Sequence, residues 1–326
     1  MTETTTLKAT RSPAAHQGPG AAATYLYYPG CSLHATAEEY DASTRAVLGA
    51  LGLGLEEVED WNCCGATPAH ASSDFLAAAL PLRNLIRAER QLEGSPDLLP
   101  EVLVPCAACY NAFRLADHHV RRGGEAGRRA AGEVEAIVGR SYRGEVTVRH
   151  PLEVLGRREA LTALSGLIRR PLKGLKVACY YGCLLVRPSQ VVSFEDDPEH
   201  PQTMDRLLAA VGAEPVSWSY KTDCCGQSMA VAERELVTEL SRRIVRAARA
   251  AGARALVTAC PLCHMNLDSR QGPGPAGEAP LPVFFYTELL ALALGVGRPE
   301  AWFRRHLVDV RPALAGLGGL EARDSA

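Results

Sequence analysis

The chain has 326 residues, 47% of them hydrophobic, and a formal net charge of −2. This length allows two packed domains of ordinary size. A net charge so close to zero offers no electrostatic basis for binding nucleic acid or an anionic membrane surface. The first 23 residues lack the apolar run of a signal peptide, and no uncharged apolar stretch of about 18 residues follows. We therefore expect a cytoplasmic protein with no direct membrane span and no nucleic-acid partner.

Strand-like and helix-like segments alternate along the chain. Residues 1–23 are polar and are predicted to form a disordered tail. Short β-rich runs predict buried strands at 25–28, 101–105, 177–181 and 255–259. Alanine- and leucine-rich segments predict helices at 37–51, 75–92 and 230–251. This alternation predicts an α/β fold with short, mostly parallel sheets flanked by helices.

Ten of the eleven cysteines follow one pattern that occurs twice: a single cysteine, then Cys-Cys-Gly, then Cys-x-x-Cys. The first copy consists of Cys31, Cys63, Cys64, Cys106 and Cys109. The second copy consists of Cys183, Cys224, Cys225, Cys260 and Cys263. Because the motifs keep the same order, we predict two homologous domains, at 24–150 and 173–310. A linker at 151–172 would join them, and a tail would follow at 311–326.

Several of these cysteines directly follow the predicted strands, so we expect them in loops at the carboxyl ends of the sheets, where sites form in open α/β folds. Five thiols per copy exceed the four ligands of a structural zinc ion. Neighbouring Cα atoms are about 3.8 Å apart. Two adjacent thiolates can therefore hardly occupy well-separated corners of one tetrahedral ion, but they can reach two irons of one cluster. The pattern indicates iron–sulfur chemistry and electron transfer. Zinc in one site and a thioredoxin-like Cys-x-x-Cys redox pair are the alternatives.

Two features depart from an exact repeat. Cys179, the eleventh cysteine, has Tyr27 at the matching position of the first copy. Strand geometry predicts a core thiol there, and the alternative is that Cys179 replaces Cys183 as a ligand. The interval from Cys64 to Cys106 is longer than the matching interval in the second copy, which predicts an enlarged loop near Ser95.

Polar residues near the motifs are candidate auxiliaries. His34 and Arg187 could bind an anionic substrate or orient a thiolate, and His264 could replace a thiolate or give a proton. Ordinary surface or packing roles are the favoured interpretation for all three. Asn111 and Asn266 follow the two Cys-x-x-Cys motifs and are expected to hydrogen-bond backbone groups in the turns.

These motifs resemble those of the Cys-Cys-Gly (CCG) domain family, specifically the HdrB component of heterodisulfide reductase and its bacterial relatives. The resemblance covers nearly all of the chain between Tyr25 and Gly297. It implies two non-cubane [4Fe–4S] clusters, each held by the five cysteines of one copy. In the family these clusters face one another and cleave a disulfide between them, and an iron captures each product thiolate.

The resemblance predicts an oxidoreductase subunit that reduces a small disulfide substrate, or oxidises thiols in the reverse direction. Because no G-x-G-x-x-G motif opens a helix after a strand, electrons should come from partner subunits. The family implies a ferredoxin-like HdrC-type subunit and a flavoprotein of the HdrA type behind it. The alternative is a non-catalytic electron-relay subunit of a succinate/fumarate, lactate/glycolate or acyl-CoA redox complex.

Overall fold

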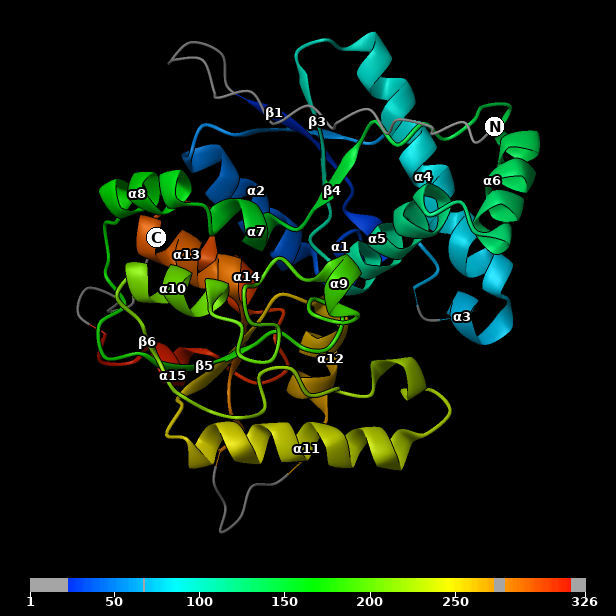
Figure 1. Ribbon diagram of the computed structural model, residues 1–326. Helices are drawn as coiled ribbons and strands as arrows, with labels where there is room; N and C mark the ends of the chain where they lie inside the picture. Colours follow the sequence, from blue (N-terminus) through cyan, green and yellow to red (C-terminus); the bar gives the residue numbers. More distant parts are fainter. Residues whose placement is uncertain (1–22, 67, 273–278, 318–326) are drawn as a thin grey trace.

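The computed structural model describes residues 23–66, 68–272 and 279–317. Residues 1–22 of the predicted N-terminal tail lie outside this part of the chain. Within the described residues, the strands form two four-stranded sheets, with the orders β2-β1-β3-β4 and β6-β5-β7-β8. Every strand pairing in both sheets is parallel. The predicted α/β class with two copies of one architecture is therefore confirmed (Figure 1).

The strands are short and lie close to their predicted positions. Those of the first sheet are β1 (Thr24–Tyr27), β2 (Gly54–Glu57), β3 (Leu98–Leu103) and β4 (Thr147–Arg149). Those of the second are β5 (Lys176–Tyr180), β6 (Glu214–Pro215), β7 (Ala255–Thr258) and β8 (Val283–Phe285). The central strands β1, β5 and β7 are almost wholly buried, because helices cover both faces of parallel sheets.

Helices connect and cover the strands. The first half of the chain forms α1 (Gly30–Leu33), α2 (Glu38–Ala50), α3 (Pro68–Ser72), α4 (Asp74–Gly94), α5 (Ala107–Arg121) and α6 (Glu125–Val138). The middle forms α7 (Pro151–Leu155) and α8 (Arg158–Leu167). The second half forms α9 (Ser189–Val192), α10 (Thr203–Ala210), α11 (Arg234–Ala250), α12 (Pro261–Ser269), α13 (Tyr286–Leu294), α14 (Pro299–Phe303) and α15 (Arg311–Leu314).

Three segments differ in detail from the sequence expectations. The helix predicted at 230–251 begins at Arg234, after a short 3-10 turn, η1 (Gln227–Met229). The segment predicted as a linker, 151–172, contains α7 and α8. The predicted C-terminal tail begins with α15, and Leu314 and Leu317 are buried. The domain boundaries themselves stay a prediction.

The expectation of an enlarged loop near Ser95 is wrong. Only residues 95–97 separate α4 from β3, whereas 251–254 separate α11 from β7. The extra residues of the first copy lengthen α4, which has 21 residues against 17 in α11. They also lengthen β3, whose pairing with β1 shifts register between Tyr25 and Leu26. A bulge of this kind absorbs inserted residues without moving the strand end.

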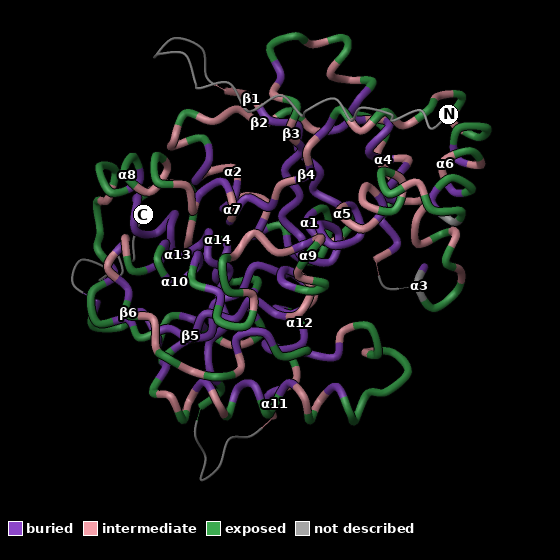
Figure 2. Tube along the Cα trace, in the orientation of Figure 1, coloured by how far each residue is buried: buried purple, intermediate pink, exposed green. Residues whose placement is uncertain are grey.

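The two halves share one contiguous apolar core. The helices α2 and α13 pack against each other between the sheets, and they lie side by side in Figure 1. The Ser43 hydroxyl of α2 lies 2.7 Å from the Thr287 hydroxyl of α13, and both are buried. By contrast, α11 lies at the edge of the molecule and buries only one face (Figure 2).

Candidate metal centres

The Cys-x-x-Cys motifs begin at the ends of the central strands β3 and β7. Cys106 caps the N-terminus of α5, and Cys260 caps the N-terminus of α12. Cys109 and Cys263 lie in the first turns of these helices. The positive end of a helix dipole favours thiolate over thiol, so both motifs stand where metal-binding sulfur is stabilised.

The thiols of the first copy form one connected group. The sulfur atoms of Cys31 and Cys63 lie 3.9 Å apart, and those of Cys64 and Cys109 lie 2.9 Å apart. Hydrogen bonds between Cys63 and Cys64 and between Cys106 and Cys109 complete the connection. All five predicted ligands of this copy are therefore brought together.

The second copy repeats this arrangement. The sulfur atoms of Cys225 and Cys263 lie 3.4 Å apart. The thiol of Cys183 interacts with that of Cys224 by a hydrogen bond, and the thiol of Cys260 does so with that of Cys263. The charges of Cys225 and Cys260 also raise the pKa of Cys183, so all five thiols of this copy lie near one another.

The two groups meet at their buried ends. The thiols of Cys106 and Cys260, which are 3% and 1% exposed, lie close enough to shift each other's pKa. At the opposite ends, Cys31, Cys63 and Cys224 are exposed to solvent. Each group thus runs from an interior contact with the other group to solvent-exposed cysteines at the surface.

Matching residues support the two groups. The Tyr28 hydroxyl donates to the carbonyl of Asn62 at 2.8 Å, and the Tyr180 hydroxyl donates to that of Asp223 at 2.7 Å. Each of these carbonyls directly precedes a Cys-Cys pair. The tyrosines therefore hold both pairs against the strand ends.

Two glycine positions in each copy approach the thiols closely. The amides of Gly65 and Gly226 lie 3.4 and 3.3 Å from the sulfurs of Cys63 and Cys224. Gly30 and Gly182 have φ values of 70° and 68°, in the left-handed region. A Cβ atom at Gly182 would lie 3.3 Å from the Cys263 sulfur, so glycine is needed there for conformation and for space.

The protonation of the thiols is strongly interdependent. A hydrogen bond from Cys183 lowers the pKa of Cys224 to about 6, and hydrogen bonds from Cys109 and Cys63 lower the pKa of Cys64. The same bonds raise the pKa values of Cys63 and Cys183, and burial adds to this effect. Neighbouring thiolates repel one another unless a cation compensates them. The donor set therefore suits a positively charged metal centre in each group.

Two of the three candidate auxiliaries, His34 and Arg187, lie at the surface. The His34 imidazole is 3.3 Å from Glu57 and packs edge-on against Trp61, with ring centroids 5.1 Å apart. The Arg187 guanidinium donates to the carbonyl of Thr222 at 3.1 Å and pairs with Glu199. Both are partly exposed and have protein partners, so their catalytic roles stay predictions.

His264, the third candidate auxiliary, points into the protein. Its Nε2 atom is 3.0 Å from the Val283 carbonyl, and its ring stacks on Phe285 at 4.3 Å. Burial lowers its pKa to about 3. This geometry agrees with the packing role that the sequence favoured.

His264, Asp268 and His306 form a buried cluster whose polar atoms could also hold a metal ion. However, Asp268 accepts the backbone N–H groups of Leu307 and Val308 at 2.7 and 3.1 Å. His306 bonds to the Val283 carbonyl and to Glu288, at 2.9 Å each. The protein itself thus satisfies these groups, and no metal is needed to explain them.

Cys179 lies in the centre of β5 and is completely buried. Burial raises the pKa of its thiol, and the thiol hydrogen-bonds to the carboxylate of Asp205. Asp205 also accepts from Lys221 at 2.7 Å and from Tyr181 at 2.8 Å. These contacts agree with the predicted core thiol.

The amides after the Cys-x-x-Cys motifs donate to backbone carbonyls, but to distant ones and not to those of the local turns. Asn266 Nδ2 donates to the carbonyl of Cys225 at 3.1 Å. Asn111 Nδ2 instead reaches the other copy, where it donates to the carbonyls of Leu184 at 2.9 Å and Arg187 at 2.7 Å. The predicted bonding within the turns is therefore wrong, because both asparagines lie in helices and their partners are brought near by the packing of the chain.

Sequence reasoning missed two buried polar residues near the meeting point, Tyr40 and His150. Tyr40 lies within the helix predicted at 37–51, and its hydroxyl was the one available signal. His150 follows a short strand that no pattern indicated. Both hydrogen-bond to the carbonyl of Pro105, the residue before Cys106, at 3.0 Å for Tyr40 and 2.6 Å for His150.

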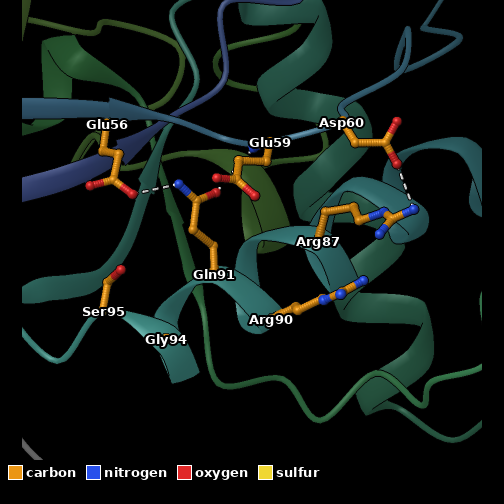
Figure 3. A pocket seen from close by; sticks show the side chains of 8 residues that line it. All are labelled: Glu56, Glu59, Asp60, Arg87, Arg90, Gln91, Gly94 and Ser95. Atoms are coloured by element: carbon orange, nitrogen blue, oxygen red, sulfur yellow. Dashed lines mark hydrogen bonds and ion pairs between the residues drawn. The ribbon is translucent and has the colours of Figure 1, made fainter.

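A separate polar pocket lies beside α4, with a cavity volume of about 310 Å³ (Figure 3). Arg87 pairs with Asp60 at 2.5 Å, and Gln91 donates to Glu56 at 2.6 Å across it. Its lining contains none of the ten motif cysteines. The pocket is therefore distinct from the candidate metal centres.

Comparison with known families matches the CCG cysteine-rich domain to residues 25–114 and 177–268. The chain belongs to the CCG cysteine-rich domain family. The HdrB component of a CoB-CoM heterodisulfide reductase from Methanosarcina acetivorans is 28% identical over 301 residues, 90% of this chain and 97% of that protein. The corresponding component from Methanosarcina mazei is 29% identical over 290 residues, 86% of this chain and 93% of that protein. The predicted resemblance is confirmed.

A third relative has a different description. The membrane anchor subunit of 8-methylmenaquinol:fumarate reductase from Wolinella succinogenes is 29% identical over 291 residues, 87% of this chain and 97% of that protein. In the described part of the CCG chain, no helix combines the length and apolar character needed to cross a membrane.

A solved structure of a hypothetical protein from Helicobacter pylori has a similar fold. The TM-score is 0.67 at 10% identity, over 91% of this chain. The CCG chain spans 55% of the length of that protein. This likeness concerns the fold alone.

Proposed function

We propose that this CCG protein is an iron–sulfur subunit of a reductase complex that reduces a disulfide with two electrons. The observation that carries the proposal is the meeting of two five-thiol groups at Cys106 and Cys260. Similarity to heterodisulfide reductase subunits over most of the chain supports it.

In this proposal each group of five cysteines holds one [4Fe–4S] cluster of the non-cubane type. When bound, the clusters would supply electrons singly and offer an iron position that acts as a Lewis acid toward a thiolate. The amides of Gly65 and Gly226 point at ligand sulfurs, and hydrogen bonds of this kind tune the reduction potential. The buried walls around Cys106 and Cys260 exclude water from the interior ends.

The reaction balances without a radical product. The S–S bond of the substrate breaks, two electrons enter, and each sulfur leaves as a thiolate that takes one proton from solvent. The exposed cysteines Cys31, Cys63 and Cys224 mark the sides from which substrate and electrons approach. A ferredoxin-like HdrC-type subunit, with an HdrA-type flavoprotein behind it, would deliver the electrons.

A second candidate function is electron relay without substrate chemistry. The fumarate reductase relative favours it, because that protein matches along nearly its whole length. In this case both clusters would pass electrons between partner subunits, and added thiols would not bind.

Metal analysis tests the proposal directly. Protein purified without oxygen is analysed for iron, sulfide and zinc, and EPR spectra are recorded before and after addition of a thiol. We expect about eight irons per chain and a thiol-sensitive signal. Eight irons with a thiol-insensitive signal would favour relay. A protein with zinc as its sole metal would contradict both candidates.

A further inference from the structure

Tyr40 connects the two copies at the residues that directly precede both Cys-x-x-Cys motifs. Its hydroxyl lies 3.0 Å from the carbonyl oxygen of Pro105 and 3.2 Å from that of Ala259. Pro105 directly precedes Cys106, and Ala259 directly precedes Cys260. The hydroxyl is therefore shared between equivalent positions of the two copies.

The Tyr40 ring is held as firmly as its hydroxyl. It is completely buried and stacks on Phe285 with 4.2 Å between ring centroids and 2° between ring planes. Tyr286 packs against its edge at 6.2 Å. A side chain of the first copy is thus enclosed by aromatic residues at the end of β8, in the second copy.

His150 reaches the same two carbonyls. Its Nε2 atom is 2.6 Å from the Pro105 oxygen, and it also bonds to the Ala259 carbonyl. Its Nδ1 atom accepts the backbone N–H of Leu152 at 3.1 Å. This bond makes Nδ1 the acceptor, so Nε2 carries the hydrogen and is the donor.

Two donors and two acceptors therefore form a closed set of hydrogen bonds between the copies. Buried carbonyl groups require such partners, and a bonded network in a dry interior holds its members rigidly. The set lies one residue from the contact between Cys106 and Cys260. A shift of either strand end would break it.

We propose that Tyr40 and His150 are positioning residues that fix the separation of the two metal centres by clamping the carbonyls of Pro105 and Ala259. The inference depends on the proposed function, because it assumes a metal centre in each copy. Precise spacing matters for this chemistry, since a misplacement of about 1 Å can cost about 100-fold in rate.

The test uses Tyr40→Phe in the full chain, purified without oxygen. The substitution keeps the stacked ring and removes the shared donor. Tyr27→Phe is the control, because the Tyr27 hydroxyl is equally buried but donates to Asp41 of its own copy at 2.7 Å. Iron content is measured together with the magnetic coupling between the two reduced centres by pulsed EPR.

We expect Tyr40→Phe to keep the wild-type iron content but to show a weaker or more heterogeneous coupling, with Tyr27→Phe unchanged. The inference would be overturned if Tyr40→Phe showed the same magnetic coupling as the wild type, or if the wild type showed no coupling between its two centres.

His150 gives a second test if Tyr40→Phe does not fold. His150→Gln offers a donor near the position of Nε2 and should retain the coupling, whereas His150→Asn mimics Nδ1 and should lose it. Equal coupling in both variants would contradict the inference.

A wild type that holds zinc and no iron would contradict the proposed function. The clamp would then be tested by the same coupling measurement after exchange of zinc for cobalt(II).

Discussion

The thiols of Cys106 and Cys260 face each other across the boundary between the two copies, close enough to shift each other's pKa. Both cysteines follow a central strand and cap the helix after it. The two Cys-x-x-Cys motifs are consequently neighbours in space although they are far apart in the chain. Two metal centres built on them would lie close enough to act on one substrate.

Substitution of one ligand should empty one centre. We expect Cys225→Ala to lose about half of the iron and all disulfide reduction, because each centre needs its own thiolates. The first copy should stay folded. Iron analysis, circular dichroism and a reductase assay check these outcomes.

Cys179→Ala is the matched control for that variant. Its thiol is buried against Asp205, so we expect wild-type iron content and a loss of about 1 kcal/mol in the free energy of unfolding. Loss of a whole cluster in this variant would show that Cys179 is a ligand.

Gly182→Ala should disturb the second centre. The new Cβ would lie 3.3 Å from the Cys263 sulfur, and the left-handed backbone would cost about 1–2 kcal/mol of stability. We expect weaker metal retention, measured as the rate at which a chelator removes iron.

Gly252→Ala separates backbone strain from contact with sulfur. Gly252 has φ of 82°, and a Cβ there meets nothing within 4 Å. This variant should lose similar stability but retain iron as the wild type does. Equal chelation rates for both variants would refute the role of Gly182 in shaping the centre.

Asn111→Asp should weaken the link between the first copy and the Cys183 loop. The change removes the donor that serves the carbonyls of Leu184 and Arg187. We expect a loss of about 1–3 kcal/mol in unfolding free energy and an altered reduction potential of one centre. Gln202→Glu, at an exposed amide that bonds to the His200 carbonyl, should change neither quantity.

The His306–Glu288 pair should make stability depend on pH. Burial opposes protonation of His306, but the Glu288 carboxylate outweighs it and raises the pKa to about 9. In the unfolded chain the pKa of a histidine is about 6.5. The stabilisation that protonated His306 provides is therefore complete below pH 6.5 and is lost as pH rises to about 9. The difference in unfolding free energy between wild type and His306→Asn should shrink over this range. His200→Asn, at an exposed site, is the control.

His150 and His264 should make the free energy of unfolding depend on pH with the opposite sign. Burial lowers their pKa values to about 4 and 3, so both are neutral in the folded protein at ordinary pH. Their contribution to the free energy of unfolding is complete above pH 6.5 and is lost as pH falls toward their pKa values in the folded protein. The three histidines together should give the greatest stability near pH 6.5. Chemical denaturation at several pH values between 4 and 9 measures this optimum. An optimum far from pH 6.5 would contradict the pKa shifts of these histidines.

Local sequence patterns predicted much of the fold. The apolar runs before Cys31, Cys106, Cys183 and Cys260 predicted the central strands, because buried parallel strands are continuously apolar. The short edge strands β2, β4 and β6 were not predicted, because so few residues show too little periodicity. The residues that lengthen α4 and β3 were predicted as a longer loop, because the length of an insertion does not show which element accommodates it.

The sequence by itself determined which cysteines belong together, since motif order and repetition define two groups without any coordinates. It also determined that glycine follows each Cys-Cys pair, where backbone approaches sulfur. Only the tertiary structure decided that the groups meet at Cys106 and Cys260, and that Tyr40 and His150 share two carbonyls there. The physical reason is that these contacts depend on how the two copies, each built on its own sheet, pack together through helices such as α2 and α13. That packing arises from the summed burial of many apolar side chains, which no local pattern encodes.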